Sequence, residues 1–104
     1  EYAAGHLGVK LIMVMGHSRC GAVDAAIHNA GHDSIIHITD EIRRAIGTET
    51  NPVCCEKKNI FHSMEQIKKS PLLQTSIKDG SLKIVGAYYH TRSGKVEILP
   101  EAEN

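Results

Sequence analysis

Two runs of apolar residues and one alternating segment predict the strands of this 104-residue chain. Residues 9–15 are apolar except for one lysine and lie between two glycines, which is typical of a parallel strand buried on both faces. Residues 82–89 form a second buried strand by the same pattern. Residues 95–99 alternate apolar and polar side chains after the turn signal Ser93-Gly94, which predicts a hairpin strand.

Helical spacing of apolar residues predicts the remaining elements. The expected helices cover residues 1–7, 22–30, 35–46, about 56–70 and 72–77. Asp33 or Ser34 can cap the third of them, and Gly47 ends it. Residues 48–52 are polar and are expected to form a loop, which also places Cys54 and Cys55 before the next helix.

This order of elements predicts an α/β fold in a single domain over residues 1–104. A long helical crossover between the first two strands favours a parallel sheet core, and the C-terminal strand should pair antiparallel at an edge. A chain of this length buries only roughly 60–70% of the surface that its unfolded form exposes.

The composition of the chain argues against nucleic-acid binding and against a membrane-spanning segment. Lys plus Arg and Asp plus Glu both total 12, so there is no basic excess of the kind that nucleic-acid and anionic-membrane binders carry. The longest purely apolar run, residues 11–15, is far too short to span a membrane. Three cysteines, two of them adjacent, make a poor disulfide framework and favour a reducing, cytoplasmic compartment.

The segment most suggestive of chemistry is Gly-His-Ser-Arg-Cys-Gly at residues 16–21, between the first strand and a helix. Ligand sites of open α/β sheets gather at the carboxyl ends of strands, where His17 and Cys20 are expected. Imidazole nitrogen and thiolate sulfur together suit zinc, at about 2.0–2.1 Å and about 2.3 Å. An isolated histidine and cysteine without a ligand role is the alternative. No phosphate-binding loop motif is present, and Arg19 precedes the cysteine, unlike the arginine of a cysteine-nucleophile phosphatase.

Three segments resemble the second half of β-class carbonic anhydrases. EYAAGHLGVKLIMVMGHSRCGAV is similar to the strand and "GHSxCGA" loop of that family, KKNIFHSMEQIKKSPLLQ to its Asn-led helix, and DGSLKIVGAYYHTRSGKVEIL to its terminal hairpin. The likeness runs from Glu1 to Leu99. His90 stands where the family often has Asp, so no role is carried to that position.

The resemblance implies zinc as cofactor, held by His17 and Cys20, and reversible hydration of carbon dioxide to bicarbonate. The family's C-x-D-x-R segment, which carries another zinc cysteine and an Asp–Arg dyad, does not occur in these residues. We therefore expect the chain to be part of a longer domain. A non-catalytic zinc-binding or structural remnant of the fold is the alternative function. The resemblance also implies a homodimer or higher homo-oligomer, as does a short sheet with an uncovered edge.

Other side chains carry weaker signals. Cys54 or Cys55 could supply a further thiolate, but a pair of surface thiols without a ligand role is favoured. A secondary metal patch could involve four histidines, although solvated positions are the commoner outcome for such residues: His28, His32, His37 and His62.

Aromatic and sulfur-containing residues of the strands are assigned to packing. Met13 and Met15 are interpreted as core residues of the first strand. Of Tyr88 and Tyr89, one is expected in the core and one partly exposed.

Overall fold

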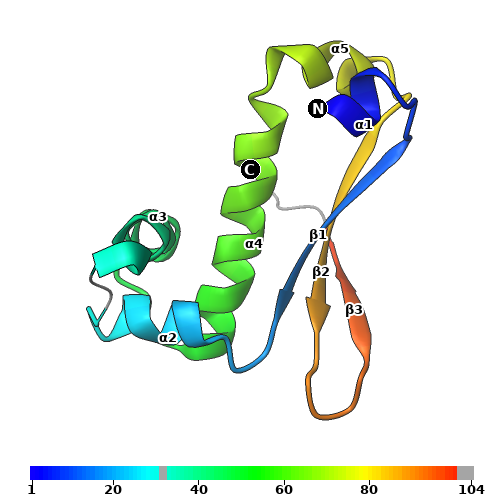
Figure 1. Cartoon of the computed structure of the whole chain (residues 1–104). Coiled ribbons are helices and arrows are strands. Elements are labelled where there is room, and N and C mark those ends of the chain that lie inside the picture. The colour runs from blue at the N-terminus through cyan, green and yellow to red at the C-terminus, as the bar shows by residue number, and fades with distance from the viewer. Residues whose placement is uncertain (31–32, 101–104) are drawn as a thin grey trace.

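A three-stranded mixed sheet with the long helix α4 along one face forms the centre of the molecule (Figure 1). The structure, a computed structural model, describes residues 1–30 and 33–100. The strands are β1 (Leu11–His17), β2 (Lys83–Tyr89) and β3 (Val96–Leu99), in the order β1-β2-β3. β1 and β2 are parallel and β2 and β3 antiparallel, so the predicted α/β fold with an antiparallel C-terminal edge strand is confirmed.

The helices occupy the connections before and between the strands. They are α1 (Tyr2–Gly5), α2 (Gly21–Ile27), α3 (Ile36–Ile46), α4 (Pro52–Lys68) and α5 (Pro71–Lys78), with a short 3₁₀ turn at Asp33–Ile35. In the part of the chain that the structure describes, no helix is both long and apolar enough to cross a membrane.

Helix α4 begins one turn earlier than the apolar spacing predicts. The Asn51 side chain accepts a hydrogen bond from the backbone N–H of Cys54 at 3.0 Å, and Pro52 occupies the first helical position. Both are standard helix-start features, because the cap satisfies a free N–H and proline has none to satisfy. The predicted loop before this helix was therefore too long, and Cys54 and Cys55 lie inside α4.

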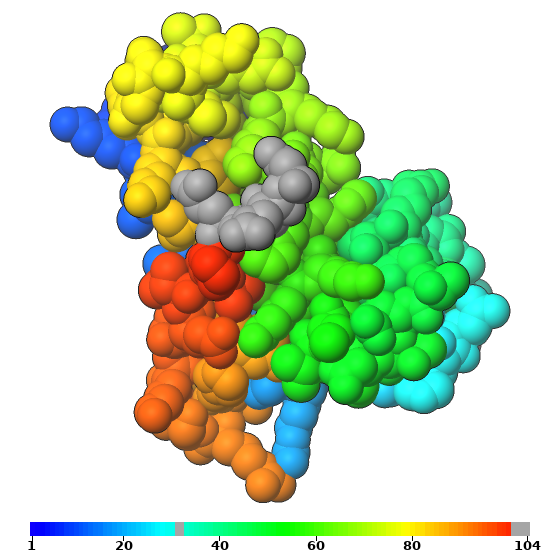
Figure 2. All heavy atoms as spheres, turned by 180° about the vertical axis from the view of Figure 1, so that it is seen from behind, coloured from blue at the N-terminus to red at the C-terminus, as the bar shows by residue number. Residues whose placement is uncertain are grey.

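Two apolar clusters lie on different sides of α4. The cluster against the sheet consists of Ile60, Met64, Ile84, Tyr88 and Leu99. The cluster against α2 and α3 consists of Val23, Ala26, Ile42, Ile46 and Cys55. Seen from behind in Figure 2, α2 and α3 (cyan to blue-green) form a lobe beside α4 (green), on the side away from β3 (red).

Glycines let α4 approach the sheet closely. A Cβ atom at Gly16 would lie 2.6 Å from Ile60 Cδ1, and one at Gly86 would lie 2.9 Å from Met64 Sδ. Carbon atoms in contact rest about 3.5–4.0 Å apart, so neither position has room for a larger residue without movement. Helix α4 thereby packs closely against the end of β1, which carries the candidate site, and against the middle of β2.

The opposite face of the sheet is open, which corrects two predictions. Side chains of β1 alternate between partly buried and exposed, so β1 is covered on one face only, not on both. Met13 and Met15 are exposed and are not core residues. The exposed apolar residues of this face are Leu11, Met13, Met15, Val96 and Ile98. We call this set the open sheet face.

Candidate metal centre

His17 and Cys20 lie at the carboxyl end of β1, as the sequence predicts. His17 is the last residue of β1 and pairs with Tyr89, the last residue of β2. Cys20 is the N-cap of α2, so two residues of a tight turn separate the two candidates. Parallel strands that end at the same edge, followed by a helix, form the usual ligand-binding position of an open α/β sheet.

The ring of His17 has one nitrogen engaged and one available. Its Nδ1 lies 2.9 Å from the carbonyl oxygen of Ser18, which can only accept, so Nδ1 carries the proton and donates. In the neutral ring, the lone pair then resides on Nε2. The side chain is exposed and continues the alternation of the open sheet face. A histidine oriented in this way is suited to metal binding through Nε2.

Cys20 is a free thiol that is partly buried. Its side chain packs against the apolar cluster between α2, α3 and α4. It also lines a hollow of about 380 Å³, together with Glu56 and residues of the turn and of α2. His17 is not among the residues that line this hollow, so the histidine and the cysteine border different parts of the turn.

Three further hydrogen bonds hold the turn between the two candidates. The backbone N–H of Ser18 donates to the carbonyl oxygen of Tyr89 at 3.0 Å. The backbone N–H of Thr91 donates to Ser18 Oγ at 2.9 Å, and the two hydroxyl oxygens lie 2.8 Å apart. The turn is thus fastened to Tyr89, the last residue of β2, and to Thr91, which follows β2 and lies 73 residues from Ser18 along the chain.

Glu56 of α4 is the functional candidate that the sequence reasoning missed. Its side chain is buried, with 4% exposure, and its Oε2 accepts the backbone N–H of Cys20 at 2.9 Å. The hydroxyl of Tyr88 donates to its Oε1 at 2.6 Å. Burial, followed by this hydrogen bond, raises the pKa of Tyr88 above its ordinary value. A signal was available, because Glu56 precedes the buried Ile60 by four residues and so lies on the packed face of α4.

The imidazole of His17 and the thiol of Cys20 are ligands that suit zinc. Two ligands are too few, however, for a complete zinc site. A catalytic zinc has three protein ligands and one open position. Among residues 1–30 and 33–100, no group of three or more His, Cys, Asp or Glu side chains is placed to hold a metal ion. The described residues therefore provide at most two ligands of such a site.

The adjacent cysteines differ sharply from each other. Cys55 has no exposed surface, and its thiol donates to the carbonyl oxygen of Glu49 at 3.2 Å. Burial, the largest cause, raises the pKa of this thiol, which disfavours the thiolate that metals bind. Cys54 is exposed. Cys55 is thus a core residue, whereas the sequence favoured two surface thiols.

The histidines do not gather into a second metal patch among the described residues. His28 Nδ1 lies 3.0 Å from the carbonyl oxygen of Asp24. His62 Nε2 lies 2.8 Å from Glu41 Oε1, an interaction that lowers the pKa of Glu41 more than any other. His32 lies outside the described residues.

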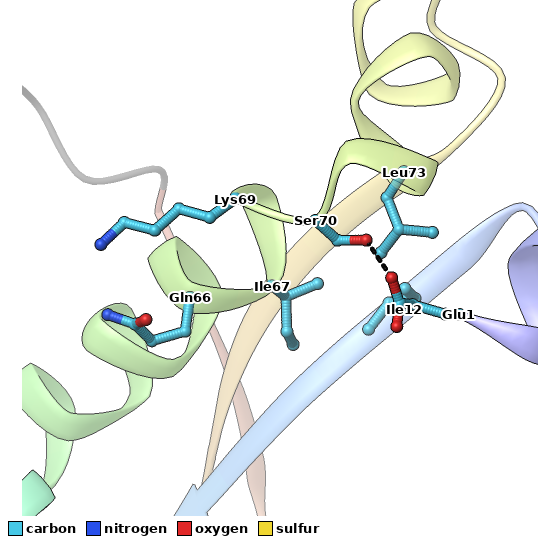
Figure 3. A pocket seen from close by; sticks show the side chains of 7 residues that line it. All are labelled: Glu1, Ile12, Gln66, Ile67, Lys69, Ser70 and Leu73. Carbon is cyan, nitrogen blue, oxygen red and sulfur yellow. Dashed lines mark hydrogen bonds between the residues drawn. The ribbon is translucent and has the colours of Figure 1, made fainter.

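A larger hollow, of about 660 Å³, lies at the other end of α4 (Figure 3). Ile12, Ile67 and Leu73 give it an apolar lining, and the Glu1 carboxylate accepts a hydrogen bond from the Ser70 hydroxyl. Its lining includes no histidine or cysteine, so it does not compete with the turn after β1 as a metal site.

The fold and the turn together define a class: an α/β protein that presents a histidine and a cysteine where a parallel strand passes into a helix. The sequence profile described as carbonic anhydrase matches residues 1–96. The chain belongs to the carbonic anhydrase family, and its similarity is to the β class.

Two curated relatives are longer than the region matched. Beta carbonic anhydrase 5, chloroplastic, of Arabidopsis thaliana is 30% identical over an alignment 104 positions long, gaps included, which covers 86% of this chain and 35% of that protein. Carbonic anhydrase of Mycolicibacterium smegmatis is 29% identical over an alignment 109 positions long, which covers 94% of this chain and 53% of that protein. The chain thus spans about a third to a half of the length of these relatives.

Solved structures support the fold. The β-carbonic anhydrase CafA of Aspergillus fumigatus has a TM-score of 0.80 and 23% identity, covering 100% of this chain and 55% of that one. One of two tetrameric β-carbonic anhydrases from Sordaria macrospora has a TM-score of 0.75 and 21% identity, covering 95% of this chain and 56% of that one. At these identities the likeness concerns the fold alone.

Proposed function

We propose that His17 and Cys20 are two zinc ligands of a β-class carbonic anhydrase site, and that the protein catalyses reversible hydration of carbon dioxide to bicarbonate. One observation carries the proposal. The two donors stand on either side of the turn from β1 to α2, inside the 96 residues that match the family.

In this proposal His17, Ser18 and Cys20 each have a role. His17 would bind through Nε2, because its Nδ1 already donates to the Ser18 carbonyl. Cys20 would bind as thiolate. Ser18 holds the peptide between them in place through its hydrogen bonds to Tyr89 and Thr91. A zinc ion held there would supply Lewis-acid activation of water near neutral pH. The third protein ligand would come from outside the described residues.

A second candidate function is zinc binding without catalysis. It is favoured by the finding that no third ligand gathers with His17 and Cys20 in residues 1–30 and 33–100. A zinc site closed by other donors, with no open position for water, would be structural.

Stopped-flow measurement of carbon dioxide hydration separates the two candidates. Under the first proposal, the zinc-loaded protein that includes the segment with the third ligand accelerates hydration, and His17→Ala and Cys20→Ser each abolish the acceleration. Cys54→Ser is the matched control, since it removes an exposed thiol and should leave the rate unchanged. Zinc uptake that depends on His17 and Cys20, with no hydration above background, would contradict the first proposal and support the second.

We further propose that the protein acts as a homo-oligomer in a reducing, cytoplasmic compartment. The open sheet face supports self-association, because apolar side chains on a sheet are seldom left in water. Three free thiols among the described residues suit a reducing compartment. Light scattering at micromolar concentration should give a mass of at least a dimer, reduced by Met13→Lys. A monomeric mass for the unaltered chain would contradict self-association.

A further inference from the structure

Glu56 connects three elements that meet at the candidate metal centre. It belongs to α4, its Oε2 accepts from the backbone of Cys20 at the start of α2, and its Oε1 accepts from Tyr88 of β2. The two partners are 36 and 32 residues away along the chain. Within residues 1–30 and 33–100, each carboxylate oxygen has one donor, so the side chain is held at both of its oxygens.

The burial of this carboxylate calls for an explanation. A buried charge is costly unless it is paired or hydrogen-bonded. No ion pair of Glu56 is found among the described residues, so the two hydrogen bonds from neutral donors provide its compensation. If this position served packing alone, an apolar residue would suit it better, like Ile60 and Met64 on the same face of α4. The two hydrogen bonds that Glu56 accepts therefore best explain why a carboxylate is buried at this position.

The backbone conformation of Arg19 explains what the hydrogen bond from the Cys20 N–H to Glu56 stabilises. Arg19 has a φ of +57°, a left-handed conformation that is unfavourable for a residue with a side chain. Such a conformation persists where the surroundings fix it, and it is common at functional sites. On one side of Arg19, the N–H of Ser18 donates to the carbonyl oxygen of Tyr89 in β2; on the other, the N–H of Cys20 donates to Glu56.

We propose that Glu56 is a positioning residue for Cys20: by holding the peptide that enters Cys20, it sets the direction in which the thiol is presented to a metal held with His17. The role rests on the proposed zinc function. Tyr88 in turn fixes the carboxylate, so the sheet, α4 and the thiol form one connected unit. Residues that orient metal ligands in this manner typically change metal affinity by about 10–100-fold when altered.

Two substitutions separate shape from charge at this position. Glu56→Gln removes the charge but keeps the length: its amide oxygen can accept from Cys20, and its amide N–H can donate to the Tyr88 oxygen. Glu56→Asp keeps the charge but is shorter by one methylene group, so it cannot reach both partners. Glu65→Gln is the matched control, because Glu65 lies on the same helix, is exposed and, among the residues that the structure describes, pairs with Lys68 alone.

The experiment measures two quantities on each variant of the 104-residue chain. The first is solvent exchange of the Cys20 amide proton, followed by NMR without metal. The second is the zinc dissociation constant, measured by competition with a chromophoric chelator in the Cys54→Ser background. Circular dichroism restricts the comparison to folded samples, and Tyr88→Phe, which frees one carboxylate oxygen, replaces any Glu56 variant that does not fold.

The proposal predicts that Glu56→Asp speeds Cys20 amide exchange and raises the zinc dissociation constant, each by about tenfold or more. Glu56→Gln and Glu65→Gln should stay within about threefold of the unaltered chain, against the 10–100-fold effect of a lost positioning contact. Two results for Glu56→Asp would overturn the proposal. One is unchanged zinc affinity although the Cys20 amide proton exchanges faster, and the other is unchanged exchange of that amide proton. If the unaltered chain bound no zinc through His17 and Cys20, the proposed function would fail, while the Cys20 amide would still report whether Glu56 holds the turn.

Discussion

Replacing Gly16 with alanine should destabilise the contact between α4 and the sheet. The added Cβ would lie 2.6 Å from Ile60 Cδ1 and 2.7 Å from Ile60 Cγ1. Since such carbons rest about 3.5 Å apart or more, a relative shift of about 1 Å is needed. Ile60 is buried in the cluster with Met64 and Leu99 and has little room to retreat.

The size of the effect follows from two opposing contributions. Overpacking of a core costs about 1–3 kcal/mol. Gly16 does not have a positive φ, so alanine is allowed by the backbone and offsets about 0.4–1 kcal/mol by restricting the unfolded chain. The net loss in the free energy of unfolding is then between about 0 and about 2.6 kcal/mol, with a midpoint of about 1.3 kcal/mol. For a domain of this size, a loss at the midpoint lowers Tm by about 5–10 °C.

Urea denaturation of a double-mutant cycle with Ile60→Ala tests the cause. Alanine lacks both the Cδ1 and the Cγ1 atoms that lie closest to the new methyl group, so Gly16→Ala should cost less in that background, with a coupling of at least about 0.5 kcal/mol. Gly21→Ala is the matched control, because a Cβ there meets nothing within 4 Å. Additive effects of Gly16→Ala and Ile60→Ala, or an equal loss in Gly21→Ala, would refute the close-approach argument.

Two further predictions concern single side chains. Cys54 should react rapidly with a disulfide reagent in the folded chain, and Cys55 only on unfolding. The reason is that Cys55 is fully buried and its thiol pKa is raised. Equal reaction rates for the two thiols would contradict this placement. Because the pKa of Tyr88 is raised in the folded state, its contribution to stability is complete below its unfolded pKa of about 10 and declines as the pH rises above that value. Urea unfolding between about pH 8 and about pH 11 should therefore show a smaller alkaline loss in Tyr88→Phe than in the control Tyr2→Phe, and equal losses would exclude Tyr88 as the cause.

The strands, and the position of His17 and Cys20 between β1 and α2, could be predicted because their signals are local. Residues 82–89 and 95–99 each match the observed strands to within one residue at either end, since alternation and Ser93-Gly94 mark them directly. The start of α4 is harder to predict, because Asn and Pro are common in loops as well as at helix starts. In the structure Asn51 caps the helix and Pro52 occupies its first position.

The open sheet face and Glu56 depend on information that is not local. An apolar run such as residues 11–15 has the same pattern whether its second face is covered by its own chain or by something else. The alternation of burial in β1 therefore appears only in the structure. The partners of Glu56 are more than 30 residues away, so only the three-dimensional arrangement identifies them.

X-ray absorption at the zinc edge of the zinc-loaded chain tests the central claim most directly. If His17 and Cys20 bind one ion, the spectrum will show a sulfur neighbour at about 2.3 Å and a nitrogen neighbour at about 2.0–2.1 Å. The sulfur signal should vanish in Cys20→Ser and persist in Cys54→Ser. A sulfur signal that survives Cys20→Ser, or a metal surrounded only by oxygen and nitrogen in the unaltered chain, would contradict the assignment.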